Sequence, residues 1–388
     1  MNSTVLHDRK STLTPEAACL LATLRQSDLA SPIPSLEPPD WNELLALAES
    51  HGVLPLFYKR FPGQLPPLYA KHYRESWANS HSLSRELEAI LGLFARSGVE
   101  ILPLKGPVLA QLLYGDVALR PSDDLDLLVR PEDFPRAEAL LIEAGFEPTG
   151  FADDYHRDFH RNGVFVELHF GIASPSAPQF DLSGAWKRAR TVDFRGHSVR
   201  FFSPVDSVLY LALHGLKHRF ARLIWVIDVG YAVRALDRTE ASRLLEHASA
   251  RQLRNILLTS CEIARLTFAI ELPPAIAQAL RSQPEIGAPS AAIADAILES
   301  IADPTTSVDS AGYYLQLADN RGRRWKQRLQ FFIPTHQDYE WLAQHRIHRR
   351  CAPLVRPFRL LAKYGPAPAF RTLFARYIKI RKKPGRSR

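Results

Sequence analysis

Apolar residues recur at helical spacing through the first part of the chain, between residues 15 and 97. The repeat runs through three clusters: Leu20, Leu21 and Leu24; Trp41, Leu44, Leu45 and Leu47; and Leu83, Leu87, Ile90, Leu91 and Phe94. Side chains three and four positions apart share one face of a helix, so each cluster predicts a helix with a buried face. Proline-rich stretches at 31–39 and 62–67 separate these helices. We therefore expect an N-terminal helical region over residues 1–97, with a frayed leader at 1–14.

Short and mainly apolar runs replace the helical spacing from Val99 onward. Residues 99–104 and 125–129 are two such runs, and runs of this length are typical of buried strands. A helical stretch follows each run, the first opened by Pro107 and the second ending at Gly145. The pattern indicates that strands and helices alternate in this part of the chain.

Asn162 and Gly163 form a dipeptide that is typical of tight β-hairpins. The flanking segments 155–162 and 164–170 therefore predict two antiparallel strands. Together with the preceding strands they make a small αβ core, which we place at residues 98–200.

Helical spacing returns after this core. Ser203, Pro204 and Asp206 are typical of a capped helix start, and they predict a helix that continues to about residue 218. A second helix over roughly 222–236 and two or three more up to about 318 make a helical domain at 201–318. The fold class is α+β: a small mixed β-sheet core, flanking helices and a mostly helical remainder.

Composition adds an uneven distribution of charge. The chain has 388 residues, enough for two or three folding units, and a net charge of +8. Residues 319–388 contain 19 basic and three acidic residues, whereas the first 318 contain 30 basic and 38 acidic ones. The molecule is therefore an acidic body with a basic, partly helical C-terminal region at 319–388, and its bulk charge says little about the main site.

Three well-separated cysteines, Cys19, Cys261 and Cys351, exclude a disulfide scaffold and a cysteine-based zinc site. The polar N-terminus does not have the pattern of a signal peptide, and no uncharged apolar run is long enough for a membrane span. We expect a cytoplasmic protein, with peripheral attachment at the inner face of the membrane as an option.

Two carboxylates stand out within the second predicted strand. Asp124 and Asp126 are two positions apart, so they project from the same face of the strand. Side-by-side carboxylates repel one another unless a cation lies between them, and a hard divalent cation such as Mg²⁺ accepts oxygen ligands of this kind. Glu167 lies among alternating apolar residues of a later strand, where an uncompensated charge is costly. These three acids are the candidate metal ligands.

The junction between the first strand and its helix supplies the complementary features. Gly106 lets backbone amides approach a ligand, and the start of the following helix favours an anion such as a triphosphate. Lys105 and Arg120 are candidate cations for the phosphates. The pattern predicts phosphoryl chemistry in which two metal ions align an attacking hydroxyl with a pyrophosphate leaving group.

These segments resemble the core of the DNA polymerase β-like nucleotidyltransferase superfamily. Within it, the chain is similar to the bacterial family of uncharacterised nucleotidyltransferases, which pairs an LKG segment with an R…DxDLLV segment. Further segments match the layout of that family: GVFVELHF at 163–170, SPVDSVLYLALHGLKHRF at 203–220, LIWVIDVGYAV at 223–233 and LVRPFRLL at 354–361. The resemblance is close over roughly 98–235.

The resemblance implies an enzyme that transfers a nucleotidyl group from an NTP, such as ATP, to an acceptor. Asp124, Asp126 and Glu167 would hold Mg²⁺, or Mn²⁺ in its place, and Gly106 would line the phosphate loop. Family members in bacterial biosynthetic settings imply a small-molecule, sugar or peptide acceptor. The chain departs from the superfamily at Pro107, where Ser or Gly is usual, because proline removes an amide donor. Phosphate contacts then fall to Lys105 or Arg120.

Structural interpretations of the same residues stay open at this point. Asp124 and Asp126 could end a strand at the surface, and Lys105 could be a surface lysine. Arg120 could pair with one of the two aspartates instead of contacting substrate.

Four further residues are candidates for the substrate side of the site. His169 follows Glu167 by two positions and points the same way, either toward the metals or into a core hydrogen bond. His214 and His218 are one helical turn apart, which is compatible with zinc ligation, with the substrate side of the helical domain or with a core position. Asp228 lies in an apolar helix, where we expect it to pair with one of these two histidines.

The basic region at 319–388 is compatible with three roles. It could be solvated, it could bind nucleic acid with Trp325, Phe331, Phe332, Tyr339 and Trp341 stacking on bases, or it could bind an anionic membrane surface. We rank a membrane surface or another anionic partner above RNA. The alternative function is therefore a catalytically inactive nucleotidyltransferase fold that binds such a partner. The oligomeric state is left open.

Overall fold

The computed structural model describes residues 13–25, 40–61, 63–152, 155–172, 180–218, 220–302, 339, 341–342, 345 and 347–364. The chain forms two structural units, Met1–Val308 and Asp309–Arg388. The finer division expected at residues 98 and 201 stays a prediction.

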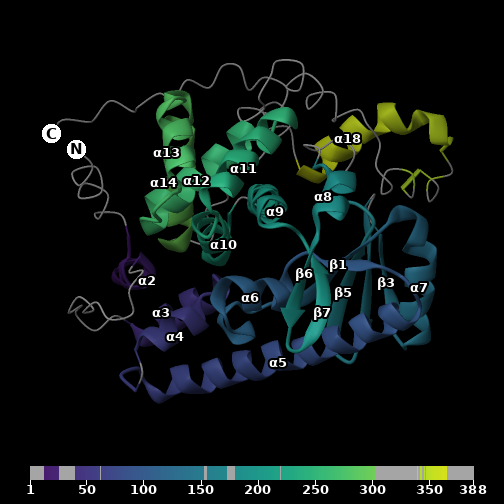
Figure 1. Ribbon diagram of the computed structural model, residues 1–388, viewed down its shortest axis with the longest axis horizontal. Helices are drawn as coiled ribbons and strands as arrows, with labels where there is room; N and C mark the ends of the chain where they lie inside the picture. Colours follow the sequence, from purple (N-terminus) through teal and green to yellow (C-terminus); the bar gives the residue numbers. More distant parts are fainter. Residues whose placement is uncertain are drawn as a thin grey trace. The chain divides into compact units, whose positions relative to one another are not determined.

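A five-stranded mixed sheet organises the first unit (Figure 1). Its strands, in the order β1-β2-β5-β4-β3, are β1 (Ile101–Pro103), β2 (Asp124–Val129), β5 (Val164–His169), β4 (His156–Arg161) and β3 (Glu147–Ala152). Strands β2 and β5 are parallel, and the other neighbouring pairs are antiparallel. This mixed sheet with its helices confirms the α+β fold class.

The two central strands carry both the core and the acidic residues. Leu125, Leu127 and Val129 of β2 are buried, as are Val166 and Leu168 of β5. These buried residues share one face of the sheet, and Asp124, Asp126 and Glu167 lie on the opposite face.

The Asn162-Gly163 dipeptide closes the β4–β5 hairpin as expected. Both residues have positive φ, 49° and 80°, which is the conformation that a two-residue type I′ turn requires. The turn sets the register that places β5 between β4 and β2.

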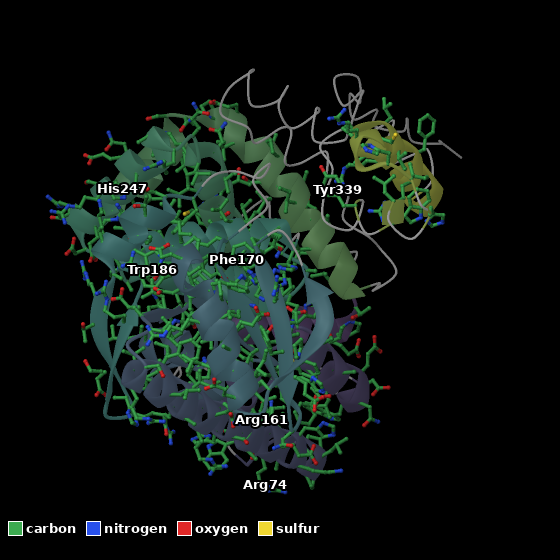
Figure 2. All side chains as sticks on the ribbon, turned by 90° about the vertical axis from the view of Figure 1, so that its right-hand side faces the viewer. Arg74, Arg161, Phe170, Trp186, His247 and Tyr339 are labelled. Carbon is green, nitrogen blue, oxygen red and sulfur yellow. The ribbon has the colours of Figure 1, made fainter. Side chains whose placement is uncertain are left out.

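The first unit begins with three short helices and one long one. These are α2 (Pro15–Arg25), α3 (Trp41–Ser50), α4 (Leu54–Arg60) and α5 (Pro67–Arg96). Helix α5 contacts β2, α6 (Gly106–Tyr114) and α7 (Phe134–Glu143), and it runs along the lower side of the unit in Figure 1. Arg161 at the end of β4, labelled in Figure 2, forms an ion pair with Glu86 of α5, and this pair links the helix to the sheet.

Short helical turns and a second hairpin complete the region of the sheet. The turns are η2 (Val117–Leu119) and η3 (Pro131–Asp133), and α8 (Leu182–Arg188) precedes the hairpin of β6 (Arg190–Phe194) and β7 (His197–Phe201). Strand β7 contacts β1. Helices α4 and α8, strand β3 and this hairpin were not predicted from the sequence.

The remaining elements of the first unit are helices. They are α9 (Pro204–Lys217), α10 (Leu223–Arg234), α11 (Arg238–Ala250), α12 (Arg254–Phe268), α13 (Pro274–Arg281), η4 (Pro284–Ile286) and α14 (Gly287–Ala302). The Ser203 side chain accepts a hydrogen bond from the Asp206 amide, which confirms the predicted cap of α9. Four α-helices follow α10 within the described residues of this unit, so the expectation of two or three was too low.

The described part of the second unit contains η6 (Arg349–Cys351) and α18 (Ala352–Tyr364). The predicted base-stacking residues Trp325, Phe331 and Phe332, and the basic end at 365–388, lie outside the described residues. Among the helices that are described, none combines the length and the apolar character of a membrane span.

Candidate active site

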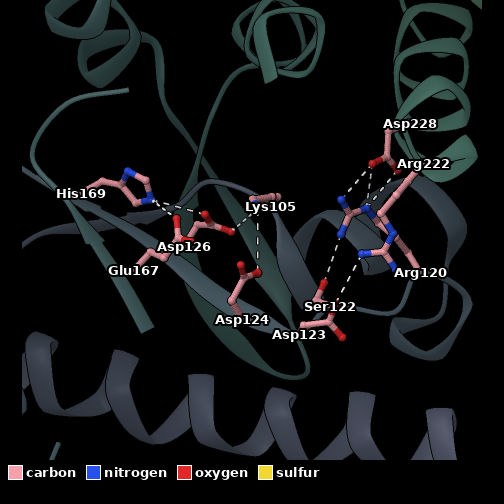
Figure 3. Close-up of polar contacts among 10 residues, drawn as sticks. All are labelled: Lys105, Arg120, Ser122, Asp123, Asp124, Asp126, Glu167, His169, Arg222 and Asp228. Atoms are coloured by element: carbon pink, nitrogen blue, oxygen red, sulfur yellow. Dashed lines mark hydrogen bonds and ion pairs between the residues drawn. The ribbon is translucent and has the colours of Figure 1, made fainter. Parts of the chain in front are cut away.

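Strand register brings the three predicted acids together. Asp126 of β2 is directly opposite Glu167 of β5 in the parallel pair, and Asp124 precedes Asp126 by two positions on the same strand. Figure 3 shows all three side chains on one side of the sheet, as strand alternation predicts. The residues therefore come from two neighbouring strands whose order the sequence did not specify.

Lys105 provides the positive charge beside two of these acids. The Leu104 amide donates to the Asp126 carbonyl at 3.0 Å, and this bond extends the β1–β2 pairing to the position before Lys105. The Lys105 Nζ is 3.0 Å from Asp126 Oδ2 and 3.8 Å from Asp124 Oδ1 (Figure 3). Burial lowers the pKa of Lys105, but the two carboxylates outweigh it and raise that pKa above its usual value.

The two aspartates respond in opposite directions to this environment. The negative charge of Asp126, together with burial, raises the pKa of Asp124 to about 7. Burial also raises the pKa of Asp126, but Lys105 and the hydrogen bond from His169 outweigh burial and hold it well below its usual value. Of the two aspartates, Asp124 is therefore the one that takes up a proton more readily, and a second cation would favour its ionisation.

His169 contacts the acids from the other side. Its Nε2 is 3.3 Å from Asp126 Oδ1 and 3.1 Å from Glu167 Oε2. Burial lowers the pKa of His169, but its contacts with these carboxylates raise the pKa overall. Its ring stacks on His156 of β4 with centroids 4.9 Å apart. His169 is thus both a buried, hydrogen-bonded residue and a neighbour of the acids, so the two interpretations hold together.

The turn from β1 into α6 has the form that a phosphate-binding junction requires. Gly106 has a φ of +69°, a conformation that side chains rarely adopt, and it starts α6 directly beside the acids. The first amides of a helix have no partner within the helix and attract anions. Pro107 removes one of these donors, so the Gly106 and Val108 amides remain.

Arg120 and Asp228 bind each other instead of their expected partners. The Arg120 Nε is 2.9 Å from Asp228 Oδ2, and the Arg120 Nη1 donates to the Ser122 hydroxyl at 3.1 Å (Figure 3). The Tyr114 hydroxyl donates to the same Asp228 carboxylate at 2.7 Å. The expected pairing of Asp228 with a histidine was wrong, because Asp228 faces η2 and α6, where Arg120 and Tyr114 lie.

His214 and His218 form an aromatic cluster with Trp225 of α10. The two imidazole centroids are 4.6 Å apart, and the Trp225 ring lies 5.4 Å from His214 and 5.1 Å from His218. Burial and the charge of neighbouring lysines lower the pKa of both histidines, that of His218 to about 4. Neither histidine belongs to the groups of three potential metal donors found among the described residues, so they offer no zinc site there.

Several residues beside the site were missed by the sequence analysis. Tyr210 is one helical turn before His214, and the charges of Asp126 and Glu167 add to burial in raising its pKa, which indicates that this face of α9 looks toward the acids. The turn-by-turn spacing of Tyr210, His214 and His218 was the signal that could have identified it. His156 and Asp158 on β4 approach Glu167, and only the sheet order reveals them.

The donor set fits a divalent metal ion. Asp126, Glu167 and His169 each offer a donor atom within 4.8 Å of the other two, and the Lys105 ammonium lies between Asp126 and Asp124, which stands outside this group. Carboxylate oxygens are the ligands that Mg²⁺ and Mn²⁺ take in proteins. The residues present can therefore hold such an ion.

Solved structures similar to this chain are nucleotidyltransferases. The solution structure of the antibiotic-resistance factor ANT(2″)-Ia is 15% identical, with a TM-score of 0.36 over 44% of this chain and 94% of that one. Its crystal structure with adenylyl-2″-tobramycin gives 14% identity and a TM-score of 0.36, over 44% and 98% of the two chains. An antigenic nucleotidyltransferase-like protein from Paracoccidioides brasiliensis gives 20% identity and a TM-score of 0.32, over 46% and 93%.

These structural similarities are too low to carry an argument, and no curated protein matches the sequence. The family assignment rests on the family model for uncharacterised nucleotidyltransferases, which matches residues 37–269, about three fifths of the chain. That match spans β1, β2 and β5, and with them the complete acidic cluster. The chain therefore belongs to the uncharacterised nucleotidyltransferase family and is a transferase.

Proposed function

We propose that this protein transfers a nucleotidyl group from an NTP to a small-molecule, sugar or peptide acceptor in a Mg²⁺-dependent reaction. The observation that carries the proposal is the convergence of Asp124, Asp126 and Glu167 beside the start of α6. An acidic cluster and an anion-binding helix start are the two halves that a metal–nucleotide complex needs.

The carboxylates would hold the metal ion, and the helix start would hold the phosphates. A bound divalent ion would supply charge stabilisation for the triphosphate and its pyrophosphate leaving group. The Gly106 and Val108 amides belong to the first turn of α6, and Lys105 is close enough to the acids to move between a carboxylate and a phosphate oxygen. Catalysis would then consist mainly of positioning and charge stabilisation.

Lys105 and Arg120 take different parts in this proposal. Among the described residues, the Lys105 ammonium has the two aspartates alone within ion-pair distance, and both would bind the metal ion in the nucleotide complex. The Arg120 guanidinium is already bound to Asp228 and Ser122. We therefore assign the phosphate contact to Lys105 and a positioning role to Arg120, which joins the sheet region to α10.

The face of α9 that carries His214 and His218 would line the substrate side of the site. Lys105 and Asp126 influence the pKa of both histidines, which indicates that this face borders the acids. Flat rings such as Trp225 bind flat apolar groups by stacking. The base or the acceptor would meet this cluster, and the acceptor itself is the unknown that an assay must identify.

The test compares conservative variants of neighbouring aspartates. Asp124→Asn and Asp126→Asn remove a metal ligand with little change in shape, and each should weaken Mg²⁺-dependent NTP binding by about tenfold or more. Asp123→Asn is the matched control, because the Asp123 side chain is 79% exposed and, within the part of the chain that the structure describes, its ion-pair partner is Arg222. Binding of labelled NTPs is measured by equilibrium dialysis with and without Mg²⁺.

The outcomes separate the proposed activity from mere retention of the fold. The proposal is supported if the wild type binds an NTP, Asp123→Asn retains this binding and Asp126→Asn abolishes it. No Mg²⁺-dependent binding of any NTP by the wild type would refute it. Incubation with labelled NTPs and a cell extract then identifies the acceptor, as the molecule whose mass increases by one nucleotidyl group.

A further inference from the structure

Asp126 divides the acidic cluster into two positions for a cation. Its Oδ2 faces Lys105 Nζ at 3.0 Å, on the side where Asp124 lies. Its Oδ1 faces His169 Nε2 at 3.3 Å, on the side where Glu167 lies (Figure 3). At the first position one oxygen atom of each aspartate faces the Lys105 ammonium, and the second position is formed by two oxygen atoms and one nitrogen atom.

The donor atoms at the second position have the spacing that a six-coordinate ion requires. In an octahedral site with bonds of about 2.1 Å, neighbouring donors are about 3 Å apart. His169 Nε2 is 3.1 Å from Glu167 Oε2 and 3.3 Å from Asp126 Oδ1, and all three atoms lie within 4.8 Å of one another. An ion could enter with small side-chain adjustments.

The imidazole is held in this orientation by packing. His169 is 4% exposed, and its ring lies parallel to His156 at 4.9 Å and to Tyr155 at 6.1 Å. Its Nδ1 has no hydrogen-bond partner among the described residues. Stacking and the β5 backbone, and not a second hydrogen bond, therefore direct Nε2 at the carboxylates.

Two carboxylate oxygens face His169 Nε2 at similar distances, and a single N–H can be shared between them in a three-centre hydrogen bond. A cation bound by all three atoms would take the place of that shared hydrogen atom. The cluster thus has the composition of a mixed nitrogen and oxygen metal site.

We propose that His169 is a metal ligand and that the position formed by Asp126, Glu167 and His169 binds a first-row transition-metal ion in preference to Mg²⁺. Mg²⁺ prefers oxygen ligands, whereas imidazole nitrogen is a ligand for transition-metal ions. The position beside Asp124 keeps an all-oxygen set that suits Mg²⁺ with the nucleotide. This inference rests on the proposed function, because it assigns the metal of the same site.

The decisive experiment uses Mn²⁺ as a spectroscopic probe of the full-length protein. Electron spin echo envelope modulation of the Mn²⁺-loaded wild type should show coupling to a directly bound ¹⁴N nucleus. This measurement needs no variant and no turnover. In His169→Gln the coupling should disappear while Mn²⁺ remains bound at the carboxylates. His156→Gln is the control for the neighbouring donor group of His156, Asp158 and Glu167, and it should retain the coupling because His156 does not belong to the group of Asp126, Glu167 and His169.

Metal affinities give a second readout. His169→Gln should weaken Mn²⁺ binding by about tenfold or more and change Mg²⁺ binding much less, because only the transition-metal ion gains from the nitrogen donor. Two results would overturn the proposal and leave the proposed function standing. One is bound Mn²⁺ without ¹⁴N coupling, and the other is coupling that is lost in His156→Gln and retained in His169→Gln. Failure to bind either ion, with or without NTP, overturns the proposed function itself.

Discussion

Arg120 and Asp228 form an ion pair that is almost completely removed from water. Their side chains are 4% and 0% exposed, and the carboxylate also accepts the Tyr114 hydroxyl. Buried charges are tolerated only where partners compensate them. The pair connects η2, which precedes the acidic strand, to α10 of the helical part, so it positions two parts of the candidate site relative to each other.

We predict that Asp228→Asn strongly destabilises the protein. The substitution keeps the shape of the side chain but leaves the Arg120 charge uncompensated in the interior, which costs about 3–5 kcal/mol of unfolding free energy. Tyr114→Phe is the matched control, because it removes one hydrogen bond to the same carboxylate and should cost about 1 kcal/mol. Urea unfolding measured by circular dichroism checks both values. Equal losses in the two variants would show that the charge of Asp228 is not what matters.

The candidate acids and the Arg120–Asp228 pair differ in how far the sequence could predict them. Strand alternation placed Asp124 and Asp126 on one face, and that inference needed only neighbouring positions. The partner of Asp228 is 108 positions away, and nothing local distinguishes Arg120 from the nearer histidines. The acids could therefore be predicted as a group, whereas the ion pair required the packing of α10 against η2 and α6.

At the scale of elements, the turn between α3 and α4 contacts the start of α10. The His51 carbonyl accepts the Ile224 amide at 3.2 Å, and the His51 Nδ1 accepts the Leu223 amide at 3.4 Å. Burial, and then the charge of Arg222, lowers the pKa of His51 to about 4. The contact between these elements thus depends on a neutral imidazole.

We predict that this contact weakens in mild acid. His51 has a pKa of about 6.5 in the unfolded chain and about 4 in the folded one, so its contribution is complete above pH 6.5 and is lost as the pH falls toward 4. Between pH 7 and pH 5 this loss amounts to about 2 kcal/mol. His51→Gln keeps an acceptor for the Leu223 amide but does not titrate. The unfolding free energy of this variant should therefore fall by about 2 kcal/mol less than that of the wild type over the same interval. Identical pH dependence in both proteins would contradict the prediction.

Elements with strong local signals were predicted, and elements at edges were not. Helix α9 has a side-chain cap and a proline in its first turn, and the β4–β5 hairpin has a turn that only a few dipeptides form. Strand β3 lies at the edge of the sheet, and its described side chains are exposed, so its sequence contains proline and glycine instead of an apolar run. Helix α4 has only seven residues, which is too short for a helical repeat to be recognised.

At the scale of the whole molecule, opposite charges belong to different parts of the chain. The acidic cluster lies in the unit Met1–Val308, whereas residues 319–388 contain 19 basic and three acidic residues. In the second unit, Leu354 and Phe358 of α18 are 72% and 73% exposed. Exposed apolar side chains on a helix with neighbouring basic residues are typical of binding to an anionic membrane surface. The residues matched by the family model, the candidate site and the mixed sheet all precede this region in the chain.

We therefore predict that the full chain binds anionic vesicles, and that a chain ending at Val308 loses this binding while it keeps Mg²⁺-dependent NTP binding. Mg²⁺-dependent NTP affinity should be unchanged, because none of the proposed ligands lies beyond α10. Sedimentation with vesicles of anionic phospholipid should decrease to the level seen with neutral vesicles, since each basic residue near such a surface contributes about 1 kcal/mol. The binding of the full chain should also fall as salt is added.

The full-length variant Leu354→Ser with Phe358→Ser isolates the apolar part of the interaction, because it retains every charge. Loss of NTP binding on truncation would instead make the second unit part of the site, and vesicle binding by the truncated chain would place the docking surface in the first unit.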